Sequence, residues 1–167
     1  MHGCQECGFS YEAEATAAAI RDGVGEVEDL LLGSSELRAR QQPEVWSPLE
    51  YGCHLRDVLL VQRERVLAAR RSDRYVCTSM GRDERVDHDG YRSQEPEDVA
   101  RQLADAAQLF GNVLDRLDAA DWMRVVIYPY PEPTERSLRW VAAHTLHEVR
   151  HHLMDIRRQL GHANWLR

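Results

Sequence analysis

Residues 140–160 read WVAAHTLHEVRHHLMDIRRQL, and this pattern predicts one long helix. Apolar residues recur there at steps of three and four, which is typical of a helix that buries one face against other helices. The apolar stripe consists of Leu138, Val141, Ala142, Leu146, Val149, Leu153, Ile156 and Leu160. Half of the chain's 8 histidines lie in the same segment, namely His144, His147, His151 and His152.

The stripe predicts which polar residues of this helix face the protein interior. At about 100° per residue, Glu148 and His152 lie roughly 60° to 100° from the centre of the stripe, and His147 and His151 lie about 160° from it. We therefore expect Glu148 and His152 to lean inward and His147 and His151 to face water.

The string from His147 to His151 also matches H-E-x-x-H, the zinc-protease motif. In that motif both histidines bind zinc and the glutamate, here Glu148, acts as general base. Histidines that face water do not fit this role, so the predicted orientation argues against a protease.

Composition limits the classes of protein that fit. The chain has 167 residues, 43% hydrophobic and 29% charged, which suits one globular domain. No run approaches the roughly 20 apolar residues that span a bilayer, and the N-terminus lacks the basic start and apolar core of a secretion signal. The formal net charge of -7 argues against nonspecific nucleic-acid binding. We expect a cytoplasmic protein without membrane or nucleic-acid partners.

Two local clusters have plain interpretations. The basic residues Arg63, Arg65, Arg70, Arg71 and Arg74 predict a solvated helix end. Cys4 and Cys7 form a C-x-x-C pair that resembles one knuckle of a zinc ribbon. Cys53 and Cys77 are too far apart in sequence to form the second knuckle. We therefore expect an unligated surface pair, and a second metal at Cys4 and Cys7 is left open.

A second helix has a clear start. The sequence Ser47-Pro48-Leu49-Glu50 combines an N-cap hydroxyl, a proline at the first helical position and the glutamate of a capping box. This helix should run to about Arg70, with His54 on its inner shoulder.

The remaining patterns predict an all-α four-helix bundle without a strong strand. Its first helix is expected from Tyr11 to Leu32 and its third from Val99 to Leu117. The segment 71–94 is expected to be a long loop and 120–134 an apolar connector that can line a pocket. The predicted organisation is an N-terminal C-x-x-C segment (1–10), the bundle (11–160) and a C-terminal tail (161–167).

Three side chains on facing helices then form a candidate metal site. His54 on the second helix, with Glu148 and His152 four residues apart on the last, offers two imidazoles and one carboxylate. These donors suit zinc, nickel or another divalent ion and leave a position open for water or substrate. The alternative is that these histidines are merely hydrogen-bonded or solvated.

At these residues the sequence resembles the DinB-like superfamily of metal-binding four-helix bundles. The resemblance lies in WSPLEYGCHLRDVL (46–59) and HEVRHHLMDI (147–156). Within the superfamily it is similar to the thiol-dependent enzymes related to mycothiol-dependent maleylpyruvate isomerase and to mycothiol and bacillithiol S-transferases. The resemblance implies His54, Glu148 and His152 as metal ligands, followed by Asp155. The second domain of the isomerase has no counterpart in these residues, which argues against maleylpyruvate chemistry.

The resemblance implies a thiol transferase. A divalent ion, with Zn²⁺ the first candidate and Ni²⁺ the second, would bind a low-molecular-weight, mycothiol-like thiol as its thiolate for attack on an electrophile. His147, His151 or Asp57 could orient the ligands. Two alternatives remain open: a metal-dependent hydrolase that activates water, and a noncatalytic metal-binding module related to stress. An exposed helical face also allows a homodimer.

Overall fold

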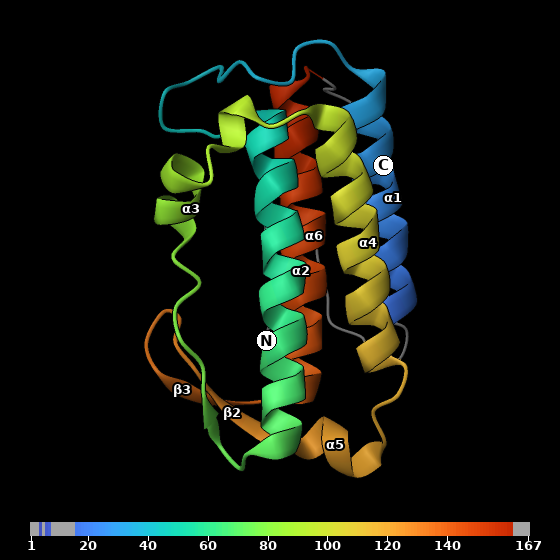
Figure 1. Cartoon of the computed structure of the whole chain (residues 1–167), viewed down its shortest axis with the longest axis vertical. Coiled ribbons are helices and arrows are strands. Elements are labelled where there is room, and N and C mark those ends of the chain that lie inside the picture. The colour runs from blue at the N-terminus through green and yellow to red at the C-terminus, as the bar shows by residue number, and fades with distance from the viewer. Residues whose placement is uncertain (1–3, 5, 8–15, 162–167) are drawn as a thin grey trace.

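Four long helices lie side by side and form the body of the molecule (Figure 1). The computed structural model describes Cys4, Glu6, Cys7 and residues 16–161. The long helices are α1 (Thr16–Gly33), α2 (Pro48–Arg71), α4 (Pro96–Leu114) and α6 (Leu138–Gln159). α4 packs against both α1 and α2, and α6 packs against the same two helices. The predicted four-helix bundle is therefore confirmed, and α2 and α6 are neighbours in it.

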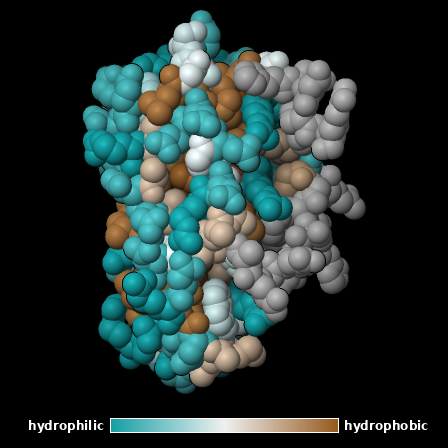
Figure 2. Space-filling model, turned by 90° about the vertical axis from the view of Figure 1, so that its right-hand side faces the viewer, coloured by the Kyte–Doolittle hydropathy of each residue, from teal (hydrophilic) through white to brown (hydrophobic). Residues whose placement is uncertain are grey.

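The core forms between the apolar stripes of these helices. Fully buried side chains come from each of them, and the largest include Ile20, Leu31, Leu55, Leu59, Leu103, Phe110 and Ile156. The face of the molecule in Figure 2 is mainly hydrophilic, with apolar residues between the polar ones. Among the described residues no helix is both long and apolar enough to cross a bilayer.

The start of α2 follows from its local sequence. The Ser47 side chain accepts a hydrogen bond from the Glu50 backbone N–H, and the Glu50 carboxylate accepts one from the Ser47 N–H at 2.8 Å. Arg40 pairs with the same buried carboxylate at 2.7 Å. The predicted capping box is present, and it fixes the first turn of the helix that carries His54.

A small sheet lies at one end of the bundle, where the sequence predicted only loop and connector. Its strands are β1 (Tyr75–Val76), β2 (Val125–Tyr128) and β3 (Thr134–Ser137), in the order β1-β2-β3. β2 pairs in parallel with β1 and antiparallel with β3. The short helix α5 (Ala119–Met123) precedes β2. The sequence predicted no strong strand, and these strands are indeed short, with two or four residues each; the sheet itself was not predicted.

The segment after β1 is also more ordered than the predicted long loop. It contains α3 (Arg82–His88) and the 3-10 turn η1 (Tyr91–Ser93). Asp57 of α2, only 4% exposed, fastens both of them. Its carboxylate accepts hydrogen bonds from Tyr91 Oη at 2.6 Å, Arg85 Nη1 at 3.2 Å and Arg56 Nε at 2.8 Å. Asp57 therefore holds the α3 segment against α2. The sequence suggested that Asp57 could orient a metal ligand, but its hydrogen bonds go to Arg56, Arg85 and Tyr91 instead.

The Asp57 network predicts a stability loss with a defined pH dependence. Asp57→Asn should lower the free energy of unfolding by about 2 kcal/mol at neutral pH, because it leaves buried cationic and hydroxyl donors without their charged acceptor. Burial raises the pKa of Asp57, but hydrogen bonds from Arg56 and Tyr91 and nearby arginine charges bring it below the ordinary 3.8. The carboxylate's contribution is thus full above about pH 4 and is lost as pH falls through the lowered folded-state pKa.

Urea unfolding of wild type and Asp57→Asn at a series of pH values measures this effect. The difference between the two proteins should be largest at neutral pH and shrink below about pH 4. Asp98→Asn removes an exposed carboxylate on α4 and serves as the control, with little expected change. A difference between wild type and Asp57→Asn that is independent of pH would contradict the role given to the charge.

Candidate metal centre

His54 lies inside the bundle with an unsatisfied ring nitrogen. The residue is 2% exposed, and its ring packs against Trp46 and His152 at centroid distances of 5.0 and 5.1 Å. Burial is the main cause that lowers the pKa of His54, which favours the neutral imidazole that a metal requires. Its Nδ1 is buried and has no hydrogen-bond partner among the described residues.

Glu148 and His152 of α6 converge on His54. The Glu148 Oε2 atom lies 3.5 Å from His152 Nε2 and 3.9 Å from His54 Nε2. One ligand atom from each of the three residues lies within 4.8 Å of the other two. Two nitrogen or oxygen ligands of a tetrahedral zinc ion, each about 2.0–2.2 Å from it, are separated by about 3.4 Å. The structure thus brings the three predicted ligands to a spacing that one ion can occupy.

The charged forms of Glu148 and His152 stabilise each other. Burial raises the pKa of Glu148, but hydrogen bonds with His152 and His54 and the histidine charges bring it well below the usual range. Burial lowers the pKa of His152, but hydrogen bonds to Asp155 and Glu148 raise it to about 9. Without an ion, a protonated His152 therefore partners the Glu148 carboxylate. An ion at the same place would provide the positive charge instead.

Asp155 orients His152. Its Oδ2 atom lies 3.0 Å from His152 Nδ1, one turn further along α6. That contact leaves His152 Nε2 directed to Glu148, the arrangement in which a carboxylate fixes the ring and tautomer of a metal-binding histidine. The sequence placed Asp155 after the ligand pair but left its role open.

The Asp155 contact predicts a moderate loss of metal affinity. Asp155→Asn should weaken metal binding at His54, Glu148 and His152 about 10-fold, because an amide orients the ring less strongly than a carboxylate. Competition titration with a chelator of known affinity measures it. Asp105→Asn, an exposed change on α4, should have no effect. Equal affinities for Asp155→Asn and wild type would show that Asp155 does not orient His152.

The three candidate ligands line a pocket of about 710 Å³. Residues of α2 and α6 form one part of its wall, and Ser79 to Glu84 form another. Tyr128, Pro129 and Tyr130 also line it, so the apolar connector has the pocket-lining role that the sequence left open. The volume lies in the range of pockets that take small organic ligands.

Comparison with known proteins assigns the family. The sequence matches the model of the DinB superfamily over residues 25–156. The chain belongs to the DinB superfamily. Its structure is similar to that of YfiT from Bacillus subtilis, described as a probable metal-dependent hydrolase with an unusual four-helix bundle topology. The two share 10% sequence identity with a TM-score of 0.77, over 92% of this chain and 94% of that one. A search of curated protein sequences finds no match.

This DinB protein has further histidines at the pocket. His144 stacks on Trp140 at a centroid distance of 4.7 Å, and its Nε2 lies 3.8 Å from Glu148 Oε1. His147 and His151 were expected to face water, but both are half-buried and line the pocket. That expectation is wrong because Cys4 and Cys7 lie against this side of α6 and are themselves half-buried.

Arg65 of this DinB bundle was predicted to belong to a solvated basic cluster, but the structure buries it. It is 7% exposed and lines the pocket. Its Nη2 donates a hydrogen bond to the Thr78 carbonyl at 2.5 Å, and the guanidinium lies 4.9 Å from the centre of the Tyr128 ring. Within the described part of the chain no carboxylate forms an ion pair with it. The pocket wall therefore contains a buried guanidinium without a salt-bridge partner among the described residues.

Proposed function

We propose that this protein is a divalent-metal-dependent hydrolase that acts in the pocket between α2, α6 and the α3 segment. The observation that carries the proposal is the convergence of His54, Glu148 and His152 on one wall of this 710 Å³ pocket. Three protein ligands beside an open pocket are typical of catalytic rather than structural metal sites.

The residues present fit an ion on chemical grounds. The donor set is two imidazoles and one carboxylate, and the Nε2 atoms of His54 and His152 both lie within 4 Å of Glu148 Oε2. When bound, a divalent ion of this kind supplies a Lewis acid that makes water nucleophilic near neutral pH. His54 and Glu148 provide ligands from two helices, and Asp155 keeps the His152 ring in place.

Two further side chains receive roles by position. His144 lies beside Glu148 and faces the pocket, so its Nε2 can take up a proton during attack and return it to the leaving group. The fixed charge of Arg65 favours a substrate that carries an anionic group, because a buried guanidinium binds carboxylate or phosphate with charge-assisted hydrogen bonds. The substrate class we infer is an ester or amide that also carries a carboxylate or phosphate group in the same molecule.

Hydrolysis is favoured over the thiol transfer implied by the sequence resemblance. Transfer requires the pocket to hold a thiol and an electrophile together, whereas hydrolysis requires one organic substrate and water. The similar fold of YfiT, described as a probable metal-dependent hydrolase, supports the same choice. The family match covers the DinB superfamily as a whole and does not distinguish its thiol-dependent members.

One assay separates the three candidate functions. The zinc-loaded protein is given aryl esters and amides that carry a carboxylate, with their uncharged counterparts, in the absence of thiol. In parallel it is given monochlorobimane with cysteine, glutathione or mycothiol. We expect hydrolysis that requires the metal and does not require thiol. A bimane conjugate formed only with thiol, without hydrolysis, would support transfer instead, and no turnover in either assay would support a binding module.

A further inference from the structure

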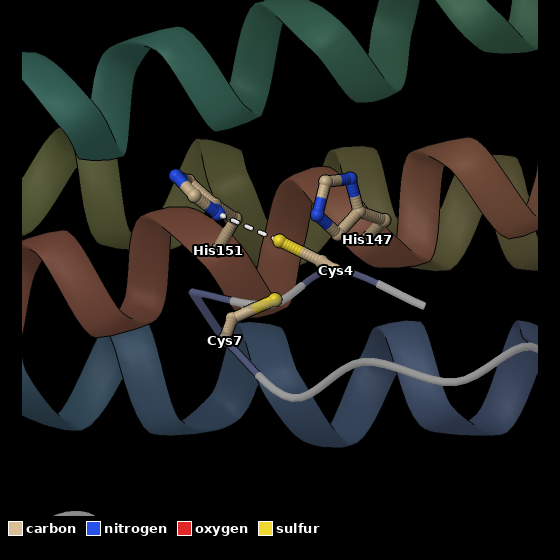
Figure 3. A group of neighbouring side chains, drawn as sticks. All are labelled: Cys4, Cys7, His147 and His151. Atoms are coloured by element: carbon tan, nitrogen blue, oxygen red, sulfur yellow. Dashed lines mark hydrogen bonds between the residues drawn. The ribbon is translucent and has the colours of Figure 1, made fainter. Parts of the chain in front are cut away.

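The structure brings the N-terminal cysteines next to two histidines of α6. One ligand atom from each of Cys4, Cys7, His147 and His151 lies within 4.8 Å of the other three. Figure 3 shows both imidazoles extending from α6 on the side of Cys4, with Cys7 beside it. The Cys4 Sγ atom lies 3.9 Å from His151 Nδ1, a contact between residues 147 positions apart in sequence.

The residue types and spacing are those of a structural zinc site. Two thiolates and two imidazoles form one of the common closed, tetrahedral zinc sets. The cysteines are spaced C-x2-C and the histidines H-x3-H, and both spacings are usual for such sites. The sequence contained only one cysteine knuckle, and the structure supplies the other half of the site from α6.

The distances agree with this set. In a tetrahedral site with zinc–sulfur bonds of about 2.3 Å and zinc–nitrogen bonds of about 2.0–2.1 Å, sulfur and nitrogen are about 3.6 Å apart. The observed 3.9 Å between Cys4 Sγ and His151 Nδ1 is close to that value. Cys4 and Cys7 are not joined by a disulfide, so both sulfurs can act as ligands.

Two carboxylates lie near the other nitrogen of His151. Its Nε2 lies 3.5 Å from Glu6 Oε2 and 3.8 Å from Asp155 Oδ2. A carboxylate at one ring nitrogen directs the other nitrogen to a metal, which here is the Nδ1 that faces Cys4. The Glu6 contact comes from the turn that separates the two cysteines, so the C-x-x-C turn also helps to orient its own histidine partner.

The two candidate sites use different residues of one helix. His147 and His151 immediately precede Glu148 and His152 along α6, and all four side chains line the pocket. A third possible metal-binding group consists of His144, His147 and Glu148. It would share His147 with the cysteine site and Glu148 with the site at His54. The four-residue set is preferred because it contains two thiolates and fills all positions of a tetrahedral ion.

We propose that Cys4, Cys7, His147 and His151 form a structural zinc site that fastens the N-terminal segment to α6. The matched family region, residues 25–156, begins after both cysteines, so the site adds a segment outside the matched bundle. Because His147 and His151 also line the pocket, zinc at this site holds that part of the pocket wall in place. The full chain then binds two metal ions, one in a closed site and one in an open site.

Cobalt substitution of the full chain tests the proposal. Co²⁺ bound by two thiolates gives a sulfur-to-metal charge-transfer band and intense visible bands of tetrahedral geometry. We expect both kinds of band in wild type. Cys4→Ser/Cys7→Ser should lose the charge-transfer band, and His147→Ala/His151→Ala should lose the intense visible bands of tetrahedral geometry. Elemental analysis should show one zinc equivalent fewer per chain in the double cysteine variant than in wild type.

Control variants make the outcomes distinct. Cys77→Ala removes a buried thiol remote from this cluster in sequence and should leave the spectrum unchanged. His54→Ala should lose one metal equivalent but keep the sulfur charge-transfer band, which separates this site from the one proposed for catalysis. Circular dichroism checks that each variant retains its helices. Absence of the charge-transfer band in wild type, or its persistence in Cys4→Ser/Cys7→Ser, would overturn the proposal.

Discussion

Glu148→Gln is expected to lower metal affinity at the open site by more than about 100-fold and to abolish metal-dependent hydrolysis. Loss of an outer-sphere partner already costs about 10- to 100-fold in comparable sites, and loss of a ligand that carries the only negative charge should exceed that. Glu148 lies between His54 and His152, so the amide would weaken the contacts on both sides.

Two comparison variants separate binding from chemistry. His144→Gln should keep the metal and lower turnover about 100-fold, because proton transfer by a positioned side chain contributes at least that much. Glu64→Gln, an exposed change on α2, should match wild type in both respects. Affinity is measured by chelator competition and turnover by kcat/KM. Wild-type affinity in Glu148→Gln would exclude this residue from the metal site.

Arg65→Gln is expected to lower kcat/KM for an anionic substrate by about 100-fold, or about 3 kcal/mol. Removing one partner of a buried, hydrogen-bonded charge pair costs this much when the other partner loses its only counter-charge. Arg65 is suited to the role because it is buried at the pocket wall. The loss should be found mainly in KM, since Arg65 binds the charged group rather than the reacting atoms.

An uncharged substrate supplies the internal control for Arg65. With the carboxylate replaced by a neutral group of similar size, Arg65→Gln and wild type should differ little. Arg71→Gln changes an exposed arginine at the end of the same helix and should have no effect on either substrate. Equal losses on charged and uncharged substrates would mean that Arg65 supports the pocket through Thr78 and Tyr128 rather than binding an anion.

The long helices could be predicted because their signals are local. The capping box at Ser47 and the apolar stripe of α6 each lie within a few turns of sequence, and both are present in the structure. The first helix was predicted from Tyr11, and its residues 11–15 lie outside the described residues, as do most of the predicted N-terminal segment and C-terminal tail.

The small sheet could not be predicted because its signals are not local. β2 has only four residues, and its partner β1 has two and lies some fifty positions earlier. Neither strand has a periodic pattern long enough to distinguish it from loop. Likewise, nothing near Asp57 in sequence indicates that its partners are Arg85 and Tyr91, since these reach it only after the chain has folded back on α2.

The candidate sites also contain some residues that local sequence patterns could identify and others that they could not. His54, Glu148 and His152 were selected because i and i+4 spacing and the direction of the apolar stripe place side chains on a helix, and the structure brings these three together. His147 and His151 were misjudged because the stripe indicates the bundle core but not a further segment packing on another side of the helix. Arg65 was misjudged because a charge cluster in sequence does not reveal which member Tyr128 and Thr78 will cover. The predicted homodimer and the thiol and electrophile partners stay predictions.

Anomalous diffraction at the zinc edge, on crystals of the zinc-loaded full chain, tests the central claim most directly. We predict an anomalous peak within about 2.2 Å of one atom from each of His54, Glu148 and His152, with its remaining coordination position open to the pocket. A fully loaded crystal in which no peak lies among these three side chains would contradict the account.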